Sequence, residues 1–230
     1  METILQVNEL GKSFTLHNQQ SAHYNVFREA NFELNRGECL VLSGRSGSGK
    51  STLLRMLYAN YLADEGSIKV KHQQDWVEMV GQDLHVLLQL RKKTIGYVSQ
   101  FLRVIPRVST LDVVMEPLLL QGESETFSQQ KSQELLNRLN LPEHLWSLAP
   151  STFSGGEQQR VNIARGFIVE YPIMLLDEPT ASLDEANKQV VVELINEAKD
   201  RGTAMVGIFH EQDVRDQVVD KIYEVEALKQ

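Results

Sequence analysis

The sequence contains little cysteine and no long apolar run. Of its 230 residues only Cys39 is a cysteine, which excludes an internal disulfide and an iron–sulfur cluster held by several thiolates. No stretch approaches the roughly 18–20 consecutive apolar residues that a membrane-spanning helix needs. The first residues, METILQVNELGKSF, lack the basic start and the apolar centre of a signal peptide. We therefore expect a cytoplasmic protein with a buried, unreactive Cys39 and no direct membrane span.

Positive charge is scarce as well. The 23 lysines and arginines are outnumbered by 31 aspartates and glutamates, so the formal net charge is −8. This acidic balance disfavours a broad nucleic-acid-binding surface, and we expect no nucleic-acid partner. What the chain does have is apolar material for a core, 42% of its residues, at a length that suits one large domain or a core with a smaller lobe.

The order of the apolar patterns predicts an α/β protein. The opening third is rich in strand patterns such as ILQVNEL, in which apolar and polar residues alternate. From residue 107 to residue 171 the spacing is helical, and after that strand and helix patterns alternate. We expect a mainly parallel sheet with helices on its faces, preceded by an antiparallel β subdomain. A helical lobe at 107–171 is then inserted into a single domain that spans 1–230.

Residues Gly44–Ser51, GRSGSGKS, fit the phosphate-binding pattern G-x-x-x-x-G-K-[ST]. A predicted apolar strand precedes them and a predicted helix follows, which is the context that the pattern requires. The glycines let the backbone bend so that its N–H groups surround phosphates. We expect Lys50 to bridge the β- and γ-phosphates and Ser51 to place its hydroxyl on Mg²⁺. The residues expected to hold the nucleotide are Gly44, Arg45, Ser46, Gly47, Ser48, Gly49, Lys50, Ser51 and Thr52.

Four polar side chains end predicted strands, at the edge where parallel sheets bind ligands. Asp177 and Glu178 follow the apolar strand that begins at Ile173. Asp177 suits a water-mediated contact with Mg²⁺, and Glu178 suits the general base that orients the attacking water. Gln100 and His210 end two other strands, where the amide can reach Mg²⁺ or that water and the imidazole can reach the γ-phosphate. The predicted catalytic residues are Glu178, His210, Gln100 and Lys50, and the predicted metal ligands are Ser51, Gln100 and Asp177.

The motifs and their order resemble the ATP-binding cassette (ABC) ATPase family over nearly the whole chain. FSGGEQQR, residues 153–160, resembles the signature motif of the family, with phenylalanine and glutamate where leucine and glutamine are common. ASLD resembles the D-loop and ends at Asp184. The resemblance implies the P-loop fold of these ATPases, ATP hydrolysis, and ATP and Mg²⁺ as cofactors. It also places Phe14 where an aromatic ring stacks on adenine, although a core phenylalanine is nearly as good an interpretation.

The same resemblance implies that the site is shared between two chains. In these ATPases two cassettes pack head to tail, and the signature residues of one hold the γ-phosphate of the ATP that the other binds. ATP then joins the two chains because it binds the closed pair better than the open monomer. We expect a second cassette as partner, an identical chain or a related subunit. The residues expected to act in trans are Ser154, Gly155, Gly156 and Glu157.

Longer stretches outside the general motifs, such as RVNIARGFIVEYPI, resemble the PhnL branch of the bacterial carbon–phosphorus lyase system. That resemblance implies an ATPase of phosphonate breakdown, partnered by lyase core subunits and by a PhnK-type cassette. The alternative is the nucleotide-binding subunit of a membrane transporter, of lipoprotein-release or macrolide-export type. FLRVIPR, residues 101–107, lies where transporter cassettes receive their permease.

Two other classes of nucleotide-binding protein are disfavoured by the sequence. A GTPase needs the guanine motif N-K-x-D, and the nearest match, NKQV at Asn187, lacks the aspartate. A chromosome-maintenance ATPase needs a long coiled coil between the phosphate-binding loop and the signature. The interval between Ser51 and Phe153 leaves no room for one.

Overall fold

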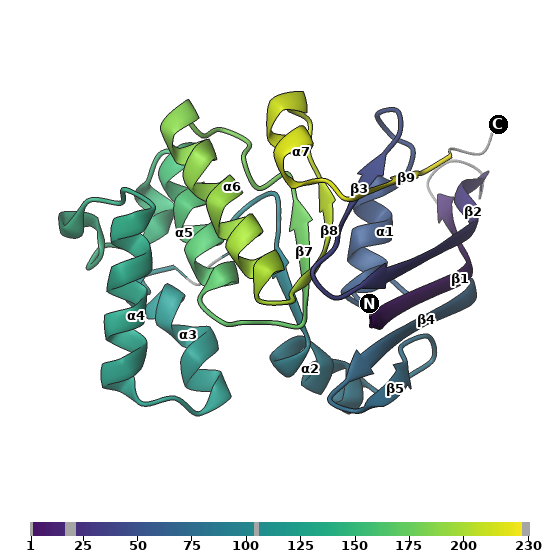
Figure 1. The fold of residues 1–230 in the computed structure, drawn as a ribbon, viewed down its shortest axis with the longest axis horizontal. Coiled ribbons are helices and arrows are strands. Elements are labelled where there is room, and N and C mark those ends of the chain that lie inside the picture. The colour runs from purple at the N-terminus through teal and green to yellow at the C-terminus, as the bar shows by residue number, and fades with distance from the viewer. Residues whose placement is uncertain (1, 17–21, 104–105, 227–230) are drawn as a thin grey trace.

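Residues 2–16, 22–103 and 106–226 are described by the computed structural model, which contains two sheets and the helices around them (Figure 1). The first sheet is antiparallel, with the strand order β2-β1-β4-β5. Along β4, Ile68 and Val70 are buried while Lys69 between them is exposed, because side chains of a strand alternate between its two faces. This sheet is the antiparallel subdomain predicted from the sequence. Its strands are β1 (Thr3–Leu16), β2 (Ala22–Asn35), β4 (Glu65–His72) and β5 (Asp75–Glu78).

The second sheet is parallel throughout the described residues, with the strand order β6-β7-β8-β3-β9. Its strands are β3 (Cys39–Ser43), β6 (Ile95–Val98), β7 (Ile173–Asp177), β8 (Ala204–Ile208) and β9 (Lys221–Glu224). β7 and β8 are buried along their whole length, which is why their sequences are apolar apart from Asp177 at the end of β7. Because the strands run in the same direction, their carboxyl ends meet at one edge, where ligands bind such sheets. The predicted parallel sheet is thus confirmed.

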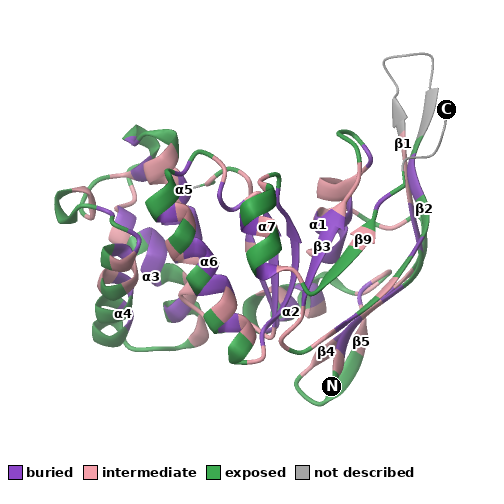
Figure 2. Cartoon of the chain, turned by 45° about the horizontal axis from the view of Figure 1, so that its top comes forward, coloured by how far each residue is buried: buried purple, intermediate pink, exposed green. Residues whose placement is uncertain are grey.

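Helices cover both faces of the parallel sheet and give the chain two apolar cores. The helices concerned are α1 (Lys50–Leu57), α2 (Leu84–Lys93), α5 (Gly155–Phe167), α6 (Glu185–Asp200) and α7 (Gln212–Val218). Alternate residues of β7 enter different cores. Leu175 packs with α1 and the antiparallel sheet, whereas Met174 and Leu176 pack with α5 and α6. Figure 2 shows buried residues on the strands and the inner helix faces, and exposed residues on the outer faces.

Between residues 107 and 171 the described chain forms helices and turns and no strand. The helices before α5 are α3 (Thr110–Gln121) and α4 (Glu125–Arg138), followed by two 3-10 turns, Glu143–Leu145 and Pro150–Thr152. Ser109 and Ser124 cap α3 and α4 by accepting a backbone N–H each. Figure 1 shows these helices gathered at one side of the parallel sheet. The exact limits of the lobe remain a prediction. No helix in the described ranges is long and apolar enough to cross a bilayer.

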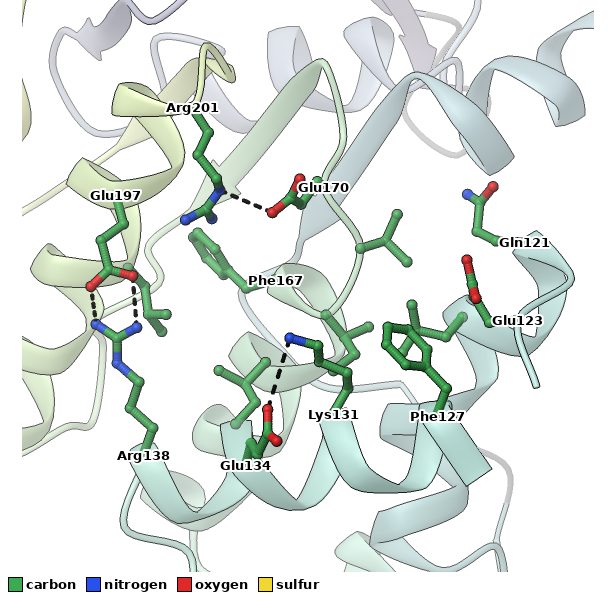
Figure 3. Close-up of a pocket in the computed structure, with 15 residues that line it drawn as sticks. Gln121, Glu123, Phe127, Lys131, Glu134, Arg138, Phe167, Glu170, Glu197 and Arg201 are labelled. Carbon is green, nitrogen blue, oxygen red and sulfur yellow. Dashed lines mark hydrogen bonds and ion pairs between the residues drawn. The ribbon is translucent and has the colours of Figure 1, made fainter. Parts of the chain in front are cut away.

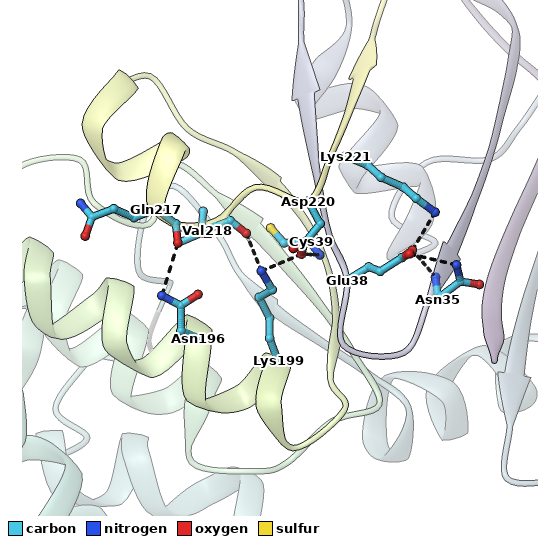
Figure 4. A network of polar contacts seen from close by, with 9 residues as sticks. All are labelled: Asn35, Glu38, Cys39, Asn196, Lys199, Gln217, Val218, Asp220 and Lys221. Carbon is cyan, nitrogen blue, oxygen red and sulfur yellow. Dashed lines mark hydrogen bonds and ion pairs between the residues drawn. The ribbon is translucent and has the colours of Figure 1, made fainter. Parts of the chain in front are cut away.

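A network of polar contacts fixes the start of β3, the strand that leads into the phosphate-binding loop (Figure 4). The Asp220 carboxylate accepts the backbone N–H of Cys39 at 2.7 Å and pairs with Lys199 at 2.6 Å. Beside it, Lys221 pairs with Glu38 at 2.8 Å. Cys39 itself is fully buried, and burial raises the pKa of its thiol to about 12. The thiol is therefore unreactive, as the sequence predicted.

Candidate active site

The phosphate-binding loop lies between the end of β3 and the start of α1, and its shape requires glycine. Gly44 has a backbone φ of +135°, and an added Cβ would come within 2.7 Å of the Ser48 hydroxyl and of the Val225 carbonyl oxygen. Gly49 has a φ of +100°, and a Cβ there would come within 2.5 Å of the Val26 side chain. Other residues fit neither position without strain. The result is a tight loop at a helix N-terminus, a form that binds anions.

Lys50, the first residue of α1, folds back over this loop. Its Nζ donates hydrogen bonds to the carbonyl oxygens of Gly44, at 2.7 Å, and Arg45, at 3.0 Å. The next residue, Ser51, donates its hydroxyl to Asp177 at 3.2 Å. This contact joins the loop to the end of β7, 126 residues further along the chain. The sequence predicted Ser51 and Asp177 as metal ligands, and the structure brings them into direct contact.

Asp177, the last residue of β7, is a buried carboxylate held by two hydroxyl groups. It is 1% exposed. One oxygen accepts the Ser51 hydroxyl, and the other accepts the hydroxyl of Tyr97, on β6, at 3.1 Å. Burial raises the pKa of the Asp177 carboxyl. Burial, together with the charge of Asp177, also raises the pKa of the Tyr97 hydroxyl, so this group stays protonated and donates.

Glu178 follows directly and has a different pair of partners. Its two carboxylate oxygens are held by Gln100 Nε2, at 3.2 Å, and by His210 Nε2, at 2.7 Å. The backbone φ of Glu178 is +53°, a left-handed conformation that costs free energy in a non-glycine residue and concentrates at functional sites. The sequence predicted that Gln100 and His210 are the last residues of their strands. In the structure β6 ends at Val98 and β8 at Ile208, so both residues lie just beyond the strand ends. The four polar side chains expected at this edge nevertheless meet there.

A cavity of about 290 Å³ opens between the loop and Glu178. Its lining consists of Phe14, Val26, Ser46, Gly47, Gly49, Lys50, Ser51, Thr52, Glu178 and His210. The half-buried ring of Phe14 also packs edge-on against Tyr61, with ring centroids 5.6 Å apart. Phe14 therefore fits both interpretations drawn from the sequence, a wall of the nucleotide site and a core residue. Of the residues predicted to bind the nucleotide, to hold the metal or to act in catalysis, those that do not line this cavity are Gly44, Arg45, Ser48, Gln100 and Asp177.

A larger cavity, of about 600 Å³, lies between the helical lobe and α6 (Figure 3). None of the predicted site residues lines it. Its arginines already have partners, since Arg138 donates to both oxygens of Glu197 and Arg201 pairs with Glu170 at 3.1 Å. The smaller cavity, beside the phosphate-binding loop, is therefore the candidate nucleotide site.

The predicted signature residues lie elsewhere, at the start of α5. Ser154 and Glu157 form a capping box: the Ser154 N–H donates to the Glu157 carboxylate at 2.8 Å, and the Glu157 N–H donates to the Ser154 hydroxyl at 3.4 Å. A Cβ on Gly156 would come within 2.9 Å of the Ser182 carbonyl oxygen, whereas one on Gly155 would meet nothing within 4 Å. None of the four signature residues lines the cavity beside the loop. The structure thus does not bring them to the nucleotide site of their own chain.

Some contacts near the site have little or no signal in the sequence. Asp184 caps α6 by accepting a backbone N–H, and Lys188, one turn further on, pairs with Glu211, the residue after His210. Nothing in the sequence pairs these two charges, because only the fold brings α6 to the loop after β8. The contact between Tyr97 and Asp177 does have a signal in the sequence, because GYVSQ places a hydroxyl-bearing ring in the same strand pattern as Gln100. A role for Tyr97 was nevertheless not predicted from the sequence.

The donors at this site fit ATP with Mg²⁺. The loop offers a glycine cradle and the Lys50 ammonium to phosphates, and Ser51 and Asp177 offer the hard oxygen ligands that Mg²⁺ prefers. Within the described ranges no three His, Cys, Asp or Glu side chains cluster as a metal site. Mg²⁺ does not require such a cluster, because it is usually bound by one or two carboxylates together with phosphate oxygens.

Comparison with known proteins decides the family. The family model described as "ABC transporter" matches residues 27–181. The chain belongs to the ABC transporter family. The lipoprotein-releasing system ATP-binding protein LolD of Idiomarina loihiensis is 35% identical over 229 residues, which cover 99% of this cassette and 95% of that protein. The ABC transporter ATP-binding protein YtrE of Bacillus subtilis is 33% identical, over 92% of this cassette and 90% of that protein.

Two dimeric structures of one bacterial ABC transporter cassette have the same fold. The first has a TM-score of 0.87 at 26% identity and covers 96% of this cassette and 94% of that chain. The second, a post-hydrolysis state bound to ADP and phosphate, has a TM-score of 0.86 at 26% identity over 97% and 94%. As a family member the chain is an ATPase that uses ATP and Mg²⁺, and a second cassette is its expected partner. Its family agrees with the predicted cytoplasmic location.

The expectation of a role in phosphonate breakdown is wrong. Four relatives that match this cassette over 84% to 99% of its length are ATP-binding proteins of lipoprotein-releasing systems. The lyase core subunits and the PhnK-type cassette, which were expected as partners because of that role, are therefore not supported either. The stretch RVNIARGFIVEYPI, which suggested that branch, forms most of α5 and leads into β7. Its α5 residues Val161, Ile163 and Ala164 are fully buried. Residues that fill a core are constrained by the fold and not by a partner, so they do not distinguish one branch from another.

Proposed function

We propose that this cassette is the ATP-hydrolysing subunit of a membrane transporter that releases lipoproteins. The observation that carries the proposal is the similarity to LolD of Idiomarina loihiensis along 99% of the cassette. LolD proteins from three other bacteria support it. A transporter subunit of this type was the alternative that the sequence left open.

In this proposal the cavity beside the phosphate-binding loop takes ATP. Residues 44–52 surround the phosphates, Lys50 exchanges its loop carbonyl partners for the β- and γ-phosphates, and Phe14 packs against the adenine. Ser51 and Asp177 hold Mg²⁺, which, when bound, neutralises charge on the phosphate oxygens. The direct contact between Ser51 and Asp177 supports this pairing, because it already places a hydroxyl and a carboxylate side by side.

Glu178 is the proposed general base, which takes the proton of the attacking water. It lines the cavity, and Gln100 and His210 each hold one of its oxygens, so its position is fixed from two sides. His210 also lines the cavity, which suits the proposed contact with the γ-phosphate. Gln100 does not line it and acts through Glu178 or through the metal. Because the base is already held in place, orienting it for the reaction costs little free energy.

The signature residues are proposed to act on the nucleotide of a second, identical chain. In their own chain they do not line the nucleotide cavity. The capping box leaves the N-terminus of α5 ordered, and Gly155 faces open space, so a phosphate of another chain can approach it. Asp184, at the D-loop, keeps the neighbouring start of α6 ordered. The dimeric state of both similar solved cassettes supports this arrangement.

A third cavity, of about 430 Å³, is the proposed docking site for the membrane subunit. Arg55, Arg103 and Arg165 line it, together with Gln100 and Phe101. Phe101 is 72% exposed, so its ring is open to contact with a partner beside the arginines of this cavity. Phe101 and Arg103 belong to FLRVIPR, where docking was expected. The mixture of cations and an exposed ring suits a partner segment with acidic and apolar side chains.

Association with the membrane in the source cell tests the proposal. The tagged Glu178→Gln cassette, held in Mg-ATP, is expected to copurify with a multi-span protein that mass spectrometry identifies. Adding Phe101→Glu is expected to abolish that association, because it places a carboxylate in the docking cavity. Ile222→Glu is the matched control, since Ile222 is 59% exposed and lies on β9, at the opposite edge of the sheet from β6.

The outcomes separate the parts of the proposal. A cassette recovered without any multi-span protein contradicts a transporter role. Equal binding by the Phe101→Glu and Ile222→Glu variants contradicts the docking site alone. If a multi-span partner is found but depletion of the cassette leaves lipoproteins in their normal membrane, the transporter role stands and lipoprotein cargo is wrong.

A further inference from the structure

Asp177 stands between two cavities, and each of its oxygens is held from one of them. Ser51, which holds one oxygen, lines the nucleotide cavity. Tyr97, which holds the other at 3.1 Å, lines the docking cavity, as Asp177 itself does. Since Asp177 is 1% exposed, water contributes little to orienting it, and these two hydroxyl groups set the plane of the carboxylate.

The Tyr97 ring is itself fixed in place. β6 pairs with β7 in parallel, and Tyr97 lies opposite Leu175 in the register. The ring packs against that of Tyr58, with centroids 4.9 Å apart. A strand position and a ring contact therefore both define where the hydroxyl points, and it points at Asp177.

We propose that Tyr97 is a positioning residue for Mg²⁺, whose hydroxyl holds the Asp177 carboxylate so that its other oxygen stays directed at Ser51 and the metal. The inference rests on the proposed role of Asp177 in holding Mg²⁺. Carboxylates that bind metals are usually hydrogen-bonded by an outer group, and the loss of such a group typically costs about 10–100-fold in metal affinity. Without the hydroxyl, Asp177 keeps one partner and can rotate about its Cβ–Cγ bond.

The Tyr97→Phe variant of the full chain tests this, because it removes the hydroxyl and keeps the ring that packs on Tyr58. The affinity for a fluorescent ATP analogue is measured in EDTA and across a Mg²⁺ titration. We expect the affinity in EDTA to be unchanged and the half-saturating Mg²⁺ concentration to rise about tenfold or more. Tyr58→Phe is the matched control: it removes a hydroxyl from the neighbouring ring, which does not contact Asp177 in the structure, and should leave the Mg²⁺ requirement unchanged.

Asp177→Asn separates failure of this inference from failure of the proposed metal site. If Asp177→Asn raises the Mg²⁺ requirement and Tyr97→Phe does not, the role of Tyr97 is overturned and the metal site stands. If neither variant changes it, both are overturned. An equal loss of affinity with and without Mg²⁺ in Tyr97→Phe also overturns the role, because that is what a purely structural residue would cause. The Mg²⁺-dependent rise in Tm of the nucleotide-bound variants provides a second readout that needs no turnover.

Discussion

The carboxylates of the nucleotide site and the signature, both of which we propose to act on ATP, are built in opposite ways. At the carboxylates, the partners come from far along the chain: Ser51 contacts Asp177 across 126 residues, and Gln100 contacts Glu178 across 78. At the signature, Ser154 and Glu157 are only three residues apart and bond to each other. The first arrangement exists only when the whole domain has folded, whereas the second needs only the first turn of α5.

The difference indicates which part is complete in one chain. The carboxylates are held by side chains from three other segments, so they need no partner chain to reach their positions. The signature loop satisfies its own groups and leaves the Gly155 side open, with nothing within 4 Å of an added Cβ. One chain therefore carries two phosphate-binding features because, in our proposal, they serve two different nucleotides. The variants below disable one part at a time.

Glu178→Gln should have the largest effect of these variants on ATP hydrolysis. The effect should be confined to the carboxylates. We expect hydrolysis to slow by roughly 10²–10⁴-fold, the usual contribution of a general base. ATP binding should persist, because Gln100 and His210 hold the side chain from outside the loop. Phosphate release and nucleotide affinity, measured on the same preparation, check both statements. Turnover close to that of the unmodified cassette would remove Glu178 from the mechanism.

Gly155→Asp should disable the signature part alone. The new side chain has room in its own chain, and a carboxylate in the first turn of a helix is favourable. Facing a γ-phosphate of another chain, however, it places like charges together, which costs several kcal/mol. We expect unchanged ATP affinity and Tm, and loss of ATP-dependent dimers by light scattering in a Glu178→Gln background. Intact dimers would contradict a signature that acts in trans.

Mixing two variants tests directly whether the signature of one chain acts on the nucleotide of another. Gly155→Asp chains retain an intact loop, and Lys50→Ala chains retain an intact signature, so a mixed dimer contains one complete site. Each variant alone should hydrolyse ATP poorly, and the mixture should regain activity. No recovery on mixing would mean that loop and signature must belong to the same chain.

Lys50→Ala should weaken nucleotide binding itself. Hydrogen bonds to a charged group contribute about 1.5–3 kcal/mol, so affinity should fall roughly 10–150-fold. Fold and stability should change little, because among the described residues the Lys50 ammonium donates hydrogen bonds only to two loop carbonyls. Lys69→Ala, an exposed lysine on β4, is the control and should leave equilibrium binding of the ATP analogue unchanged. Similar affinities for the two variants would argue against the phosphate cradle.

Much of the fold could be predicted because it depends on local patterns. Apolar runs at 173–176 and 204–208 indicated strands of the parallel sheet, and both are central strands in the structure. The meeting of Gln100, Glu178 and His210 followed from a topological rule, since parallel strands end at one edge.

What sequence reasoning could not supply depends on three-dimensional contact or on surface chemistry. The pair Lys188–Glu211 joins two segments that only the fold brings together. The branch assignment failed for a related reason: it relied on buried residues of α5, such as Val161 and Ile163, which report the fold. Exposed residues such as Phe101 are free of the constraints of the core, so a partner can determine what they are.

Ser154→Ala should give the smallest effect on the isolated chain and yet separate the two roles of that residue. Loss of a serine cap costs about 0.5–2 kcal/mol, which lowers Tm by a few degrees, ~2–4 °C per kcal/mol, in a chain of this size. Ser124→Ala removes the corresponding cap of α4 and should cost a similar amount. Only Ser154→Ala should also weaken ATP-dependent dimers, because only its hydroxyl lies in the signature. Equal dimerisation by the two variants would make Ser154 a helix cap and nothing more.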